Sequence, residues 1–144
     1  MVAAMQKSIG KPTHRIMDVN ATNIDELDIL CLKSKKDSQG YRDKVKWVKD
    51  RFKEGLRLKL LLVEEKRGRQ KERRSLTSRG FIEYIPGEFT WRAIDAKGYM
   101  VIHCIWVVGK IKGQGLGSEL LAECLNDAEG MKGVAVVTTE KTWL

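Results

Sequence analysis

The feature that most constrains the fold is a group of three glycines between a long apolar run and an amphipathic run. Residues 99–108 (YMVIHCIWVV) are almost entirely apolar, and Gly113, Gly115 and Gly117 follow them closely. Further apolar residues then recur at helical spacing: Leu116, Leu120, Leu121, Cys124, Leu125 and Ala128. A glycine turn between a strand and a helix exposes backbone N–H groups beside the positive end of the helix dipole. The pattern therefore predicts a phosphate site.

Two other phosphate-binding patterns do not fit this turn. A P-loop requires a Gly-Lys-Ser/Thr ending, which the segment lacks. The dinucleotide pattern G-x-G-x-x-G places its third glycine on Ser118 or on Leu120, depending on the starting glycine. Glu140, at the end of the next expected strand, is a minor point in favour of a dinucleotide. A turn that only packs the helix on the sheet, without a ligand, stays open at this point.

The rest of the chain alternates strand and helix patterns. We expect strands over 14–19, 57–65, 80–85, 99–108 and 134–140. We expect helices from Ile24 to Cys31 behind a weak Thr22–Asp25 capping box, over 41–54, and from Leu116 to Ala128. Strands 57–65 and 80–85 pair antiparallel across the long connection 66–79. Strand 99–108 is central because both its faces are apolar, and 134–140 lies parallel to it because a helix crosses between them.

Composition limits the class of protein. The 144 residues suffice for one domain, and their net charge of +8 favours an anionic partner. The run KRGRQKERR (66–74) contains six basic residues and one Glu. Three cysteines (Cys31, Cys104 and Cys124) and two histidines fit no zinc spacing, so we expect reduced thiols and no metal. The sequence has no signal-peptide core and no apolar run of bilayer length, and we expect a soluble, cytoplasmic protein.

The glycine turn has a closer counterpart in a known family. The segment KGQGLG (112–117) resembles the Arg/Gln-x-x-Gly-x-Gly/Ala acyl-CoA signature of the GNAT superfamily of N-acyltransferases. The order of expected elements is also similar to that family. Four longer segments resemble its YoaP-like branch: WVKDRFKEGL, GFIEYIPGE, GYMVIHCIWVVG and KGQGLGSELLAECLNDA.

The resemblance implies a single α/β domain over residues 1–144 that transfers acetyl from acetyl-CoA directly to an amine. The expected fold is a GNAT-like mixed sheet with antiparallel N-terminal strands, a central splayed strand and a helix behind the pyrophosphate loop. Lys112 stands where the family has Arg or Gln, and the 99–108 backbone pairs with the pantetheine arm. By position, the CoA-binding residues are Val107, Val108, Lys112, Gly113, Gln114, Gly115, Leu116, Gly117 and Ser118.

Transfer needs a base for the ammonium and a donor for the thioester carbonyl. Backbone N–H groups around Trp106 to Val108 can donate. Strand 99–108 contains no carboxylate, so His103 is a candidate base, with a hydrogen-bonded core histidine as the alternative. Glu83 and Glu88 are further candidate bases, and the alternative for each is a solvated surface charge. Cys104 lacks the partners of a nucleophile.

Other residues have an expected position but no assigned role in acetyl transfer. Trp47, Trp91 and Trp106 can line an acceptor pocket, and core packing is the preferred role for Trp106. The basic run 66–74 is a solvated loop, with a CoA 3′-phosphate contact or nucleic-acid binding as weaker alternatives. The acceptor is a small-molecule or peptide amine, and we expect neither nucleic acid nor a membrane as a partner. The rival functions are an acyl-CoA-binding module without turnover and a basic nucleic-acid-binding domain.

The segment VAVV (134–137) reads as a strand covered on both faces, yet few residues follow it. Family members continue past this strand with a helix and two strands, which complete the CoA cleft and often carry a Tyr that acts as general acid. We therefore expect an incomplete domain that lacks the last helix and strands. The expected consequences are weak CoA binding, little turnover and self-association through the edge strand 134–140.

Overall fold

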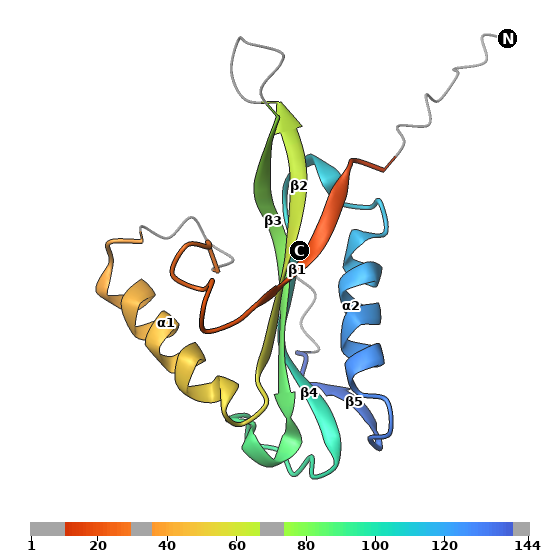
Figure 1. Ribbon diagram of the computed structural model, residues 1–144. Coiled ribbons are helices and arrows are strands. Elements are labelled where there is room, and N and C mark those ends of the chain that lie inside the picture. Colours follow the sequence, from red (N-terminus) through yellow and green to blue (C-terminus); the bar gives the residue numbers. More distant parts are fainter. Residues whose placement is uncertain (1–10, 30–35, 67–73, 140–144) are drawn as a thin grey trace, which may run out of the picture.

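The computed structural model describes residues 11–29, 36–66 and 74–139 of the chain. A five-stranded sheet runs through its centre in the order β1-β2-β3-β4-β5, with helix α1 on one face and helix α2 on the other (Figure 1). The elements are β1 (His14–Val19), α1 (Gln39–Phe52), β2 (Arg57–Lys66), β3 (Arg74–Pro86), β4 (Tyr99–Val107), α2 (Leu116–Asp127) and β5 (Gly133–Val136). Short 3₁₀ turns cover Gly87–Phe89 and Gly109–Ile111.

The pairing confirms the predicted mixed sheet. Strands β1 to β4 are antiparallel neighbours, and β5 is parallel to β4 because α2 crosses between them. Alternating side chains give each face its own core. Leu58, Leu60 and Ile85 pack toward α1, whereas Leu61, Ile82 and Ile102 pack toward α2.

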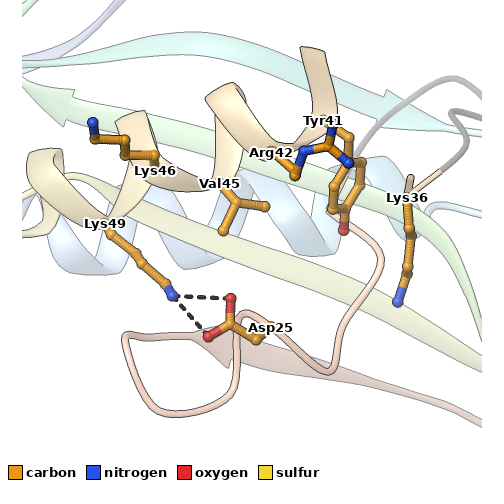
Figure 2. Close-up of a pocket in the computed structure, with 7 residues that line it drawn as sticks. All are labelled: Asp25, Lys36, Tyr41, Arg42, Val45, Lys46 and Lys49. Carbon is orange, nitrogen blue, oxygen red and sulfur yellow. Dashed lines mark hydrogen bonds and ion pairs between the residues drawn. The ribbon is translucent and has the colours of Figure 1, made fainter. Parts of the chain in front are cut away.

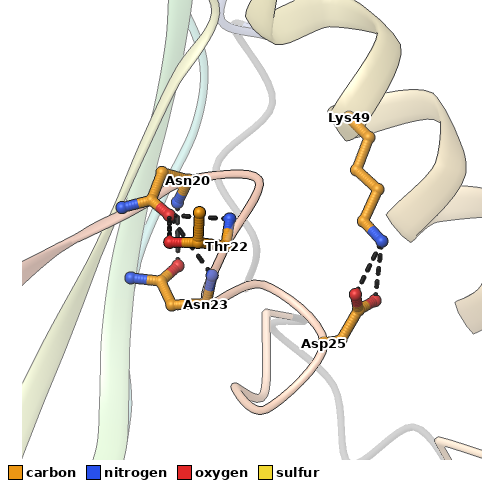
Figure 3. A network of polar contacts seen from close by, with 5 residues as sticks. All are labelled: Asn20, Thr22, Asn23, Asp25 and Lys49. Carbon is orange, nitrogen blue, oxygen red and sulfur yellow. Dashed lines mark hydrogen bonds and ion pairs between the residues drawn. The ribbon is translucent and has the colours of Figure 1, made fainter.

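Helix α1 matches the prediction for 41–54, but the predicted helix from Ile24 is wrong over the described part, 21–29, which forms turns. Asn20, not Thr22, organises this segment. Its Oδ1 accepts hydrogen bonds from the backbone N–H groups of Thr22 and Asn23 at 2.9 and 3.2 Å (Figure 3). Ile24 and Ile29 are nevertheless buried, so the apolar spacing marked core residues of an irregular segment.

Two strand boundaries, and the burial and central place of one strand, differ from the prediction. Strand β3 begins at Arg74, not at residue 80, and replaces much of the expected connection; of the basic run, 67–73 lie outside the described residues. Strand β5 ends at Val136, which is 55% exposed, so it is not covered on both faces. Burial on both faces of β4 holds only from Met100 to His103, and Ile105 is exposed. The middle strand of the described sheet is β3, not β4.

Cys124, a residue of α2, is fully buried in the core on that face, and burial raises the pKa of its thiol to about 12, which keeps it protonated. Cys104 is half-buried on the opposite face, and Cys31 lies outside the described residues. No group of three His, Cys, Asp or Glu side chains in the described segments has an arrangement that suits a metal ion. None of the helices in the described segments is long and apolar enough to cross a bilayer.

Candidate functional site

The glycine turn is shaped by two backbone positions with positive φ. Gly113 has φ +77° and Gly115, the residue that caps α2, has φ +81°, a region that side chains other than glycine rarely adopt. Gly117 lies in the first turn of α2 with ordinary φ. A Cβ there would meet Val107 at 3.8 Å, an ordinary contact. Two of the three glycines therefore determine the turn.

The turn presents a row of unused donors. Within the described segments, no N–H group from Gly113 to Ser118 has a hydrogen-bond acceptor, and the first such bond of α2 joins Glu119 N–H to the Gly115 carbonyl. Lys112 and Ser118 are exposed beside this row. The Gln114 amide donates to the Lys110 carbonyl at 3.3 Å, while its buried Oε1 has no hydrogen-bond partner among the described residues. Converging N–H groups at a helix start suit a phosphate or diphosphate.

Two basic residues that the sequence analysis did not single out lie near this turn. Lys11 Nζ and His14 Nε2 each contact a carboxylate oxygen of Glu119 at 2.6 Å. A hydrogen bond to the Pro12 carbonyl, followed by that to Glu119, raises the pKa of His14. Hydrogen bonds from Lys11 and His14 lower the pKa of Glu119. The sequence alone could not identify Lys11 and His14 as neighbours of the turn, because the N-terminal segment contacts α2 only in the folded chain.

The C-terminal part of β4, which leads to the glycine turn, is not paired with β5. Their pairing runs only from Tyr99 opposite Gly133 to Ile102 opposite Val136. Val108 N–H donates to the Arg79 carbonyl at 2.9 Å, so this predicted donor is already used. Because N–H groups alternate along a strand, those of Ile105 and Val107 face away from β3, toward the open side of β4. This edge suits an extended chain with amide groups.

On the α1 face, a β-bulge brings the two candidate bases together. Glu83 pairs with Cys104 and Tyr84 with Ile102, which leaves His103 as the extra residue of β4. His103 Nδ1 lies 3.4 Å from Glu83 Oε1, and both side chains are buried. Lys44, from α1, contacts the other oxygen of Glu83 at 2.6 Å. Glu88 lies outside this cluster and accepts from the Gly98 N–H at 2.9 Å, a contact that ties down a loop.

Both nitrogens of His103 have partners. The indole N–H of Trp91 donates to Nδ1 at 3.1 Å, and Nε2 lies 2.9 Å from the Thr90 hydroxyl. A nitrogen that accepts from Trp91 carries no proton, so we assign the neutral ring with its proton on Nε2. In this state Nδ1 cannot donate to Glu83, and the ring has no lone pair left for a substrate. The geometry favours the core-histidine interpretation of His103.

Glu83 is the carboxylate of the cluster. Burial by itself raises its pKa, but a hydrogen bond from His103, when that ring is protonated, and the Lys44 ammonium together lower it. In the neutral-ring state that we assign, Lys44 is the main stabilising partner. Glu83 is therefore ionised, and its affinity for a proton depends on where the Lys44 ammonium lies.

The cluster borders two adjoining pockets. One, of about 220 Å³, is lined by Ile29, Lys44, Phe81, Glu83, Trp91, Arg92, His103 and Cys104. The other, of about 260 Å³, is lined by Lys44, Trp47 and Trp91. Trp47 and Trp91 therefore line a pocket, and its occupation by the acceptor stays a prediction. Trp106 lines neither pocket and is 36% exposed, so the prediction of core packing is wrong for it.

A further cavity, of about 400 Å³, lies against α1. Its lining includes three basic residues of that helix, Arg42, Lys46 and Lys49. Figure 2 shows Arg42, Lys46 and Lys49 on α1, with Lys49 bonded to both oxygens of Asp25 at 2.7 and 2.9 Å. Figure 3 shows the same pair beside the Asn20 turn. Asp25, the one carboxylate among the described residues that line this cavity, therefore holds the irregular segment to α1, and these residues include no acid–base pair.

Known proteins resemble the chain in sequence and in fold. The profile of the Acetyltransferase (GNAT) family matches residues 47–142. The chain is 32% identical over 128 residues to YoaP of Bacillus subtilis (strain 168), described as an uncharacterized N-acetyltransferase. That match covers 87% of this chain and 46% of YoaP, so the chain spans about half the length of this curated relative.

Two solved structures show the same fold. An aminoglycoside N-acetyltransferase, AAC(6′)-Iy, in complex with CoA superimposes with a TM-score of 0.58 at 12% identity, over 90% of this chain and 79% of that one. A predicted acetyltransferase with acetyl-CoA from Clostridium acetobutylicum gives a TM-score of 0.52 at 9% identity, over 89% and 82% of the two chains.

Proposed function

The chain belongs to the GNAT acetyltransferase family, and from this premise we propose that it binds acetyl-CoA and transfers the acetyl group directly to an amine. One observation carries the proposal: the six N–H groups from Gly113 to Ser118, without acceptors in the described segments, lie at the end of β4 where its edge is open. Two structural neighbours that are complexes with CoA or acetyl-CoA support the choice of ligand.

The residues of the turn and of β4 divide the binding between them. The N–H groups from Gly113 to Ser118 hold the diphosphate, and Lys112 adds a cation beside it. Ile105 and Val107 N–H groups face the pantetheine amides and the thioester carbonyl, where a donor stabilises developing negative charge. Bound acetyl-CoA supplies the thioester carbon that the amine attacks.

Glu83 is the base in this proposal. It accepts a proton from the acceptor ammonium, because both nitrogens of His103 are engaged and Glu83 is the remaining group of the described cluster that can accept one. With Lys44 at 2.6 Å, Glu83 is a weak base. When the Lys44 ammonium moves away, burial raises the proton affinity of Glu83. The cluster offers no general acid for the leaving thiolate, and we assign none.

The decisive experiment combines a CoA-release assay over a panel of amines with calorimetric CoA binding. We expect binding and turnover in the wild type. Glu83→Gln should lower turnover about 100-fold or more while CoA affinity stays within twofold. Glu88→Gln is the matched control and should keep its turnover.

The alternatives separate in the same data. CoA binding without turnover for any amine favours an acyl-CoA-binding module. Equal turnover in Glu83→Gln and wild type removes Glu83 as the base. No CoA binding at all contradicts the proposal, and binding of a salt-sensitive nucleic-acid probe in its place would favour the basic-domain alternative.

We also propose that the chain self-associates through β5. Strand β5 is the edge of the described sheet, and Val136 and Val137 are 55% and 48% exposed. An exposed apolar edge pairs readily with another strand. Light scattering should show a dimer or larger species, which Val136→Lys should shift toward monomer. A wild type that stays monomeric at high concentration would contradict this proposal.

A further inference from the structure

The pocket on the α1 face contains a guanidinium without a counter-charge. Arg92 lines the same pocket as Glu83, Lys44 and His103. In the part of the chain that the structure describes, its Nη2 donates to the His103 carbonyl at 3.0 Å, while its Nε is buried and has no acceptor. No carboxylate of the described residues lies within ion-pair distance of this side chain. A buried donor without a partner is costly, which indicates a missing acceptor.

Arg92 is also held in place. Its guanidinium lies over the Trp91 ring, 4.1 Å from the centroid, and its own backbone N–H donates to the Thr90 hydroxyl at 3.2 Å. The Thr90 hydroxyl in turn contacts His103 at 2.9 Å, so Arg92, Trp91 and His103 form one connected group. A guanidinium fixed in this way presents a planar set of donors that matches a carboxylate.

The charges of the pocket do not balance. Lys44 and Arg92 contribute two positive charges and Glu83 contributes one negative charge, while His103 is neutral in the tautomer assigned above. An acceptor ammonium that takes the place of Lys44 beside Glu83 leaves two cations without a partner. In a partly buried site, an occupant that also carries an anion restores the balance.

We propose that the acceptor is a small amine that carries a carboxylate, with its ammonium beside Glu83 and its carboxylate on Arg92. This proposal rests on the proposed acetyl transfer and names the class of its acceptor. The two adjoining pockets, of about 220 and 260 Å³, suit a molecule the size of an amino acid. The ring walls of Trp47 and Trp91 offer contact area for an apolar side chain.

Matched pairs of acceptors test the proposal. Phenylalanine and 2-phenylethylamine differ by the carboxylate alone, as do lysine and cadaverine. Each is titrated into the CoA-saturated protein, with tryptophan fluorescence and calorimetry as binding readouts, and each is assayed for CoA release from acetyl-CoA. We expect the carboxylate member of at least one pair to bind at least tenfold more tightly, about 1.4 kcal/mol.

Variants assign the effect to Arg92. Arg92→Gln should lower the affinity for the carboxylate member at least tenfold and leave that for the decarboxylated member within threefold. Arg92→Lys, which keeps the charge but loses the planar fork, should fall between. Arg15→Gln removes the same charge from an exposed position on β1 and should change neither. CoA affinity in each variant reports that the fold is intact.

The outcomes separate this inference from the proposed function. Selective binding of carboxylate amines without CoA release supports the acceptor site and contradicts acetyl transfer. CoA release with equal or better use of the decarboxylated amines overturns the acceptor class alone. An equal loss for both members in Arg92→Gln also overturns it, and so does the absence of binding by every pair.

Discussion

The two faces of the sheet carry two kinds of site. On the α2 face, the glycine turn offers backbone N–H groups, and its shape depends on positive φ at Gly113 and Gly115. On the α1 face, the cluster around Glu83 consists of side chains from α1, β3, β4 and the segment after β3. A backbone site tolerates most side-chain changes but not a change of backbone conformation. A side-chain cluster loses its function when the group that carries the chemistry is replaced.

The difference also separates binding from chemistry. Under the proposed function, the turn holds the phosphates of CoA, whereas the α1 face selects the amine that is presented to the thioester. Substitutions on one face should therefore leave the property of the other face nearly unchanged. Three further predictions test this independence, beginning with the largest expected effect.

Gly115→Asp should produce the largest change. The substitution forces a side chain into a backbone region with φ +81° and places a negative charge beside the unused N–H groups. We expect CoA affinity to fall at least tenfold, about 1.4 kcal/mol, in calorimetry. Gly40→Asp is the matched control, because a Cβ there meets nothing within 4 Å and α1 lies on the other face. Unchanged affinity in a folded Gly115→Asp protein would contradict the acyl-CoA assignment.

His103→Gln should have a smaller effect, confined to the α1 face. Because both ring nitrogens are engaged, we expect a loss of turnover below about tenfold, unchanged CoA affinity, and retention of the acidic limb of the kcat/KM profile. The measurement is a pH–rate profile of both proteins. Disappearance of the acidic limb in the variant would make His103 the base and Glu83 its partner.

The smallest effect concerns the salt-bridged cluster beside the turn. The raised pKa of His14 means that the folded state favours the charged ring. Its contribution to stability is complete below pH 6.5 and is lost as the pH rises through the folded pKa, which lies above 6.5. The difference in free energy of unfolding between wild type and His14→Gln, at most about 1 kcal/mol at pH 6, should therefore shrink toward pH 8 in denaturant titrations. A difference that grows over this range would show the opposite sign of coupling.

The sequence predicted the parts of the molecule that depend on local pattern. The glycine turn follows from residues that alone adopt positive φ readily, and the parallel pairing of β5 follows from the helix between the strands. The buried positions Val48 of α1 and Leu116, Leu120 and Cys124 of α2 follow from apolar spacing, whereas Leu121 and Leu125, predicted for the same face of α2, are exposed.

The side-chain cluster could not be predicted in full. The bulge at His103 shifts the alternation of β4 by one residue, and no residue type marks it. Glu83 and His103 appeared as separate candidates, although they share one pocket. Lys44 and Arg92 are two of many basic residues, and only the fold brings them to that pocket. The predicted helix from Ile24 failed because the Asn20 side chain satisfies the backbone in a turn.

The short ladder between β4 and β5 has a consequence for the dynamics of the fold. The β4–β5 ladder has four residue pairs, and the whole of α2 lies between its two strands in the sequence. The β2–β3 ladder has ten residue pairs between strands that are close in the sequence. Contacts that close a long stretch of chain for few hydrogen bonds form late in folding and open at low free energy. Amide hydrogen exchange should therefore be faster for Val134 and Ala135 than for Leu60 and Leu61. A ligand lying along the open edge of β4 would slow exchange at β5 without touching it.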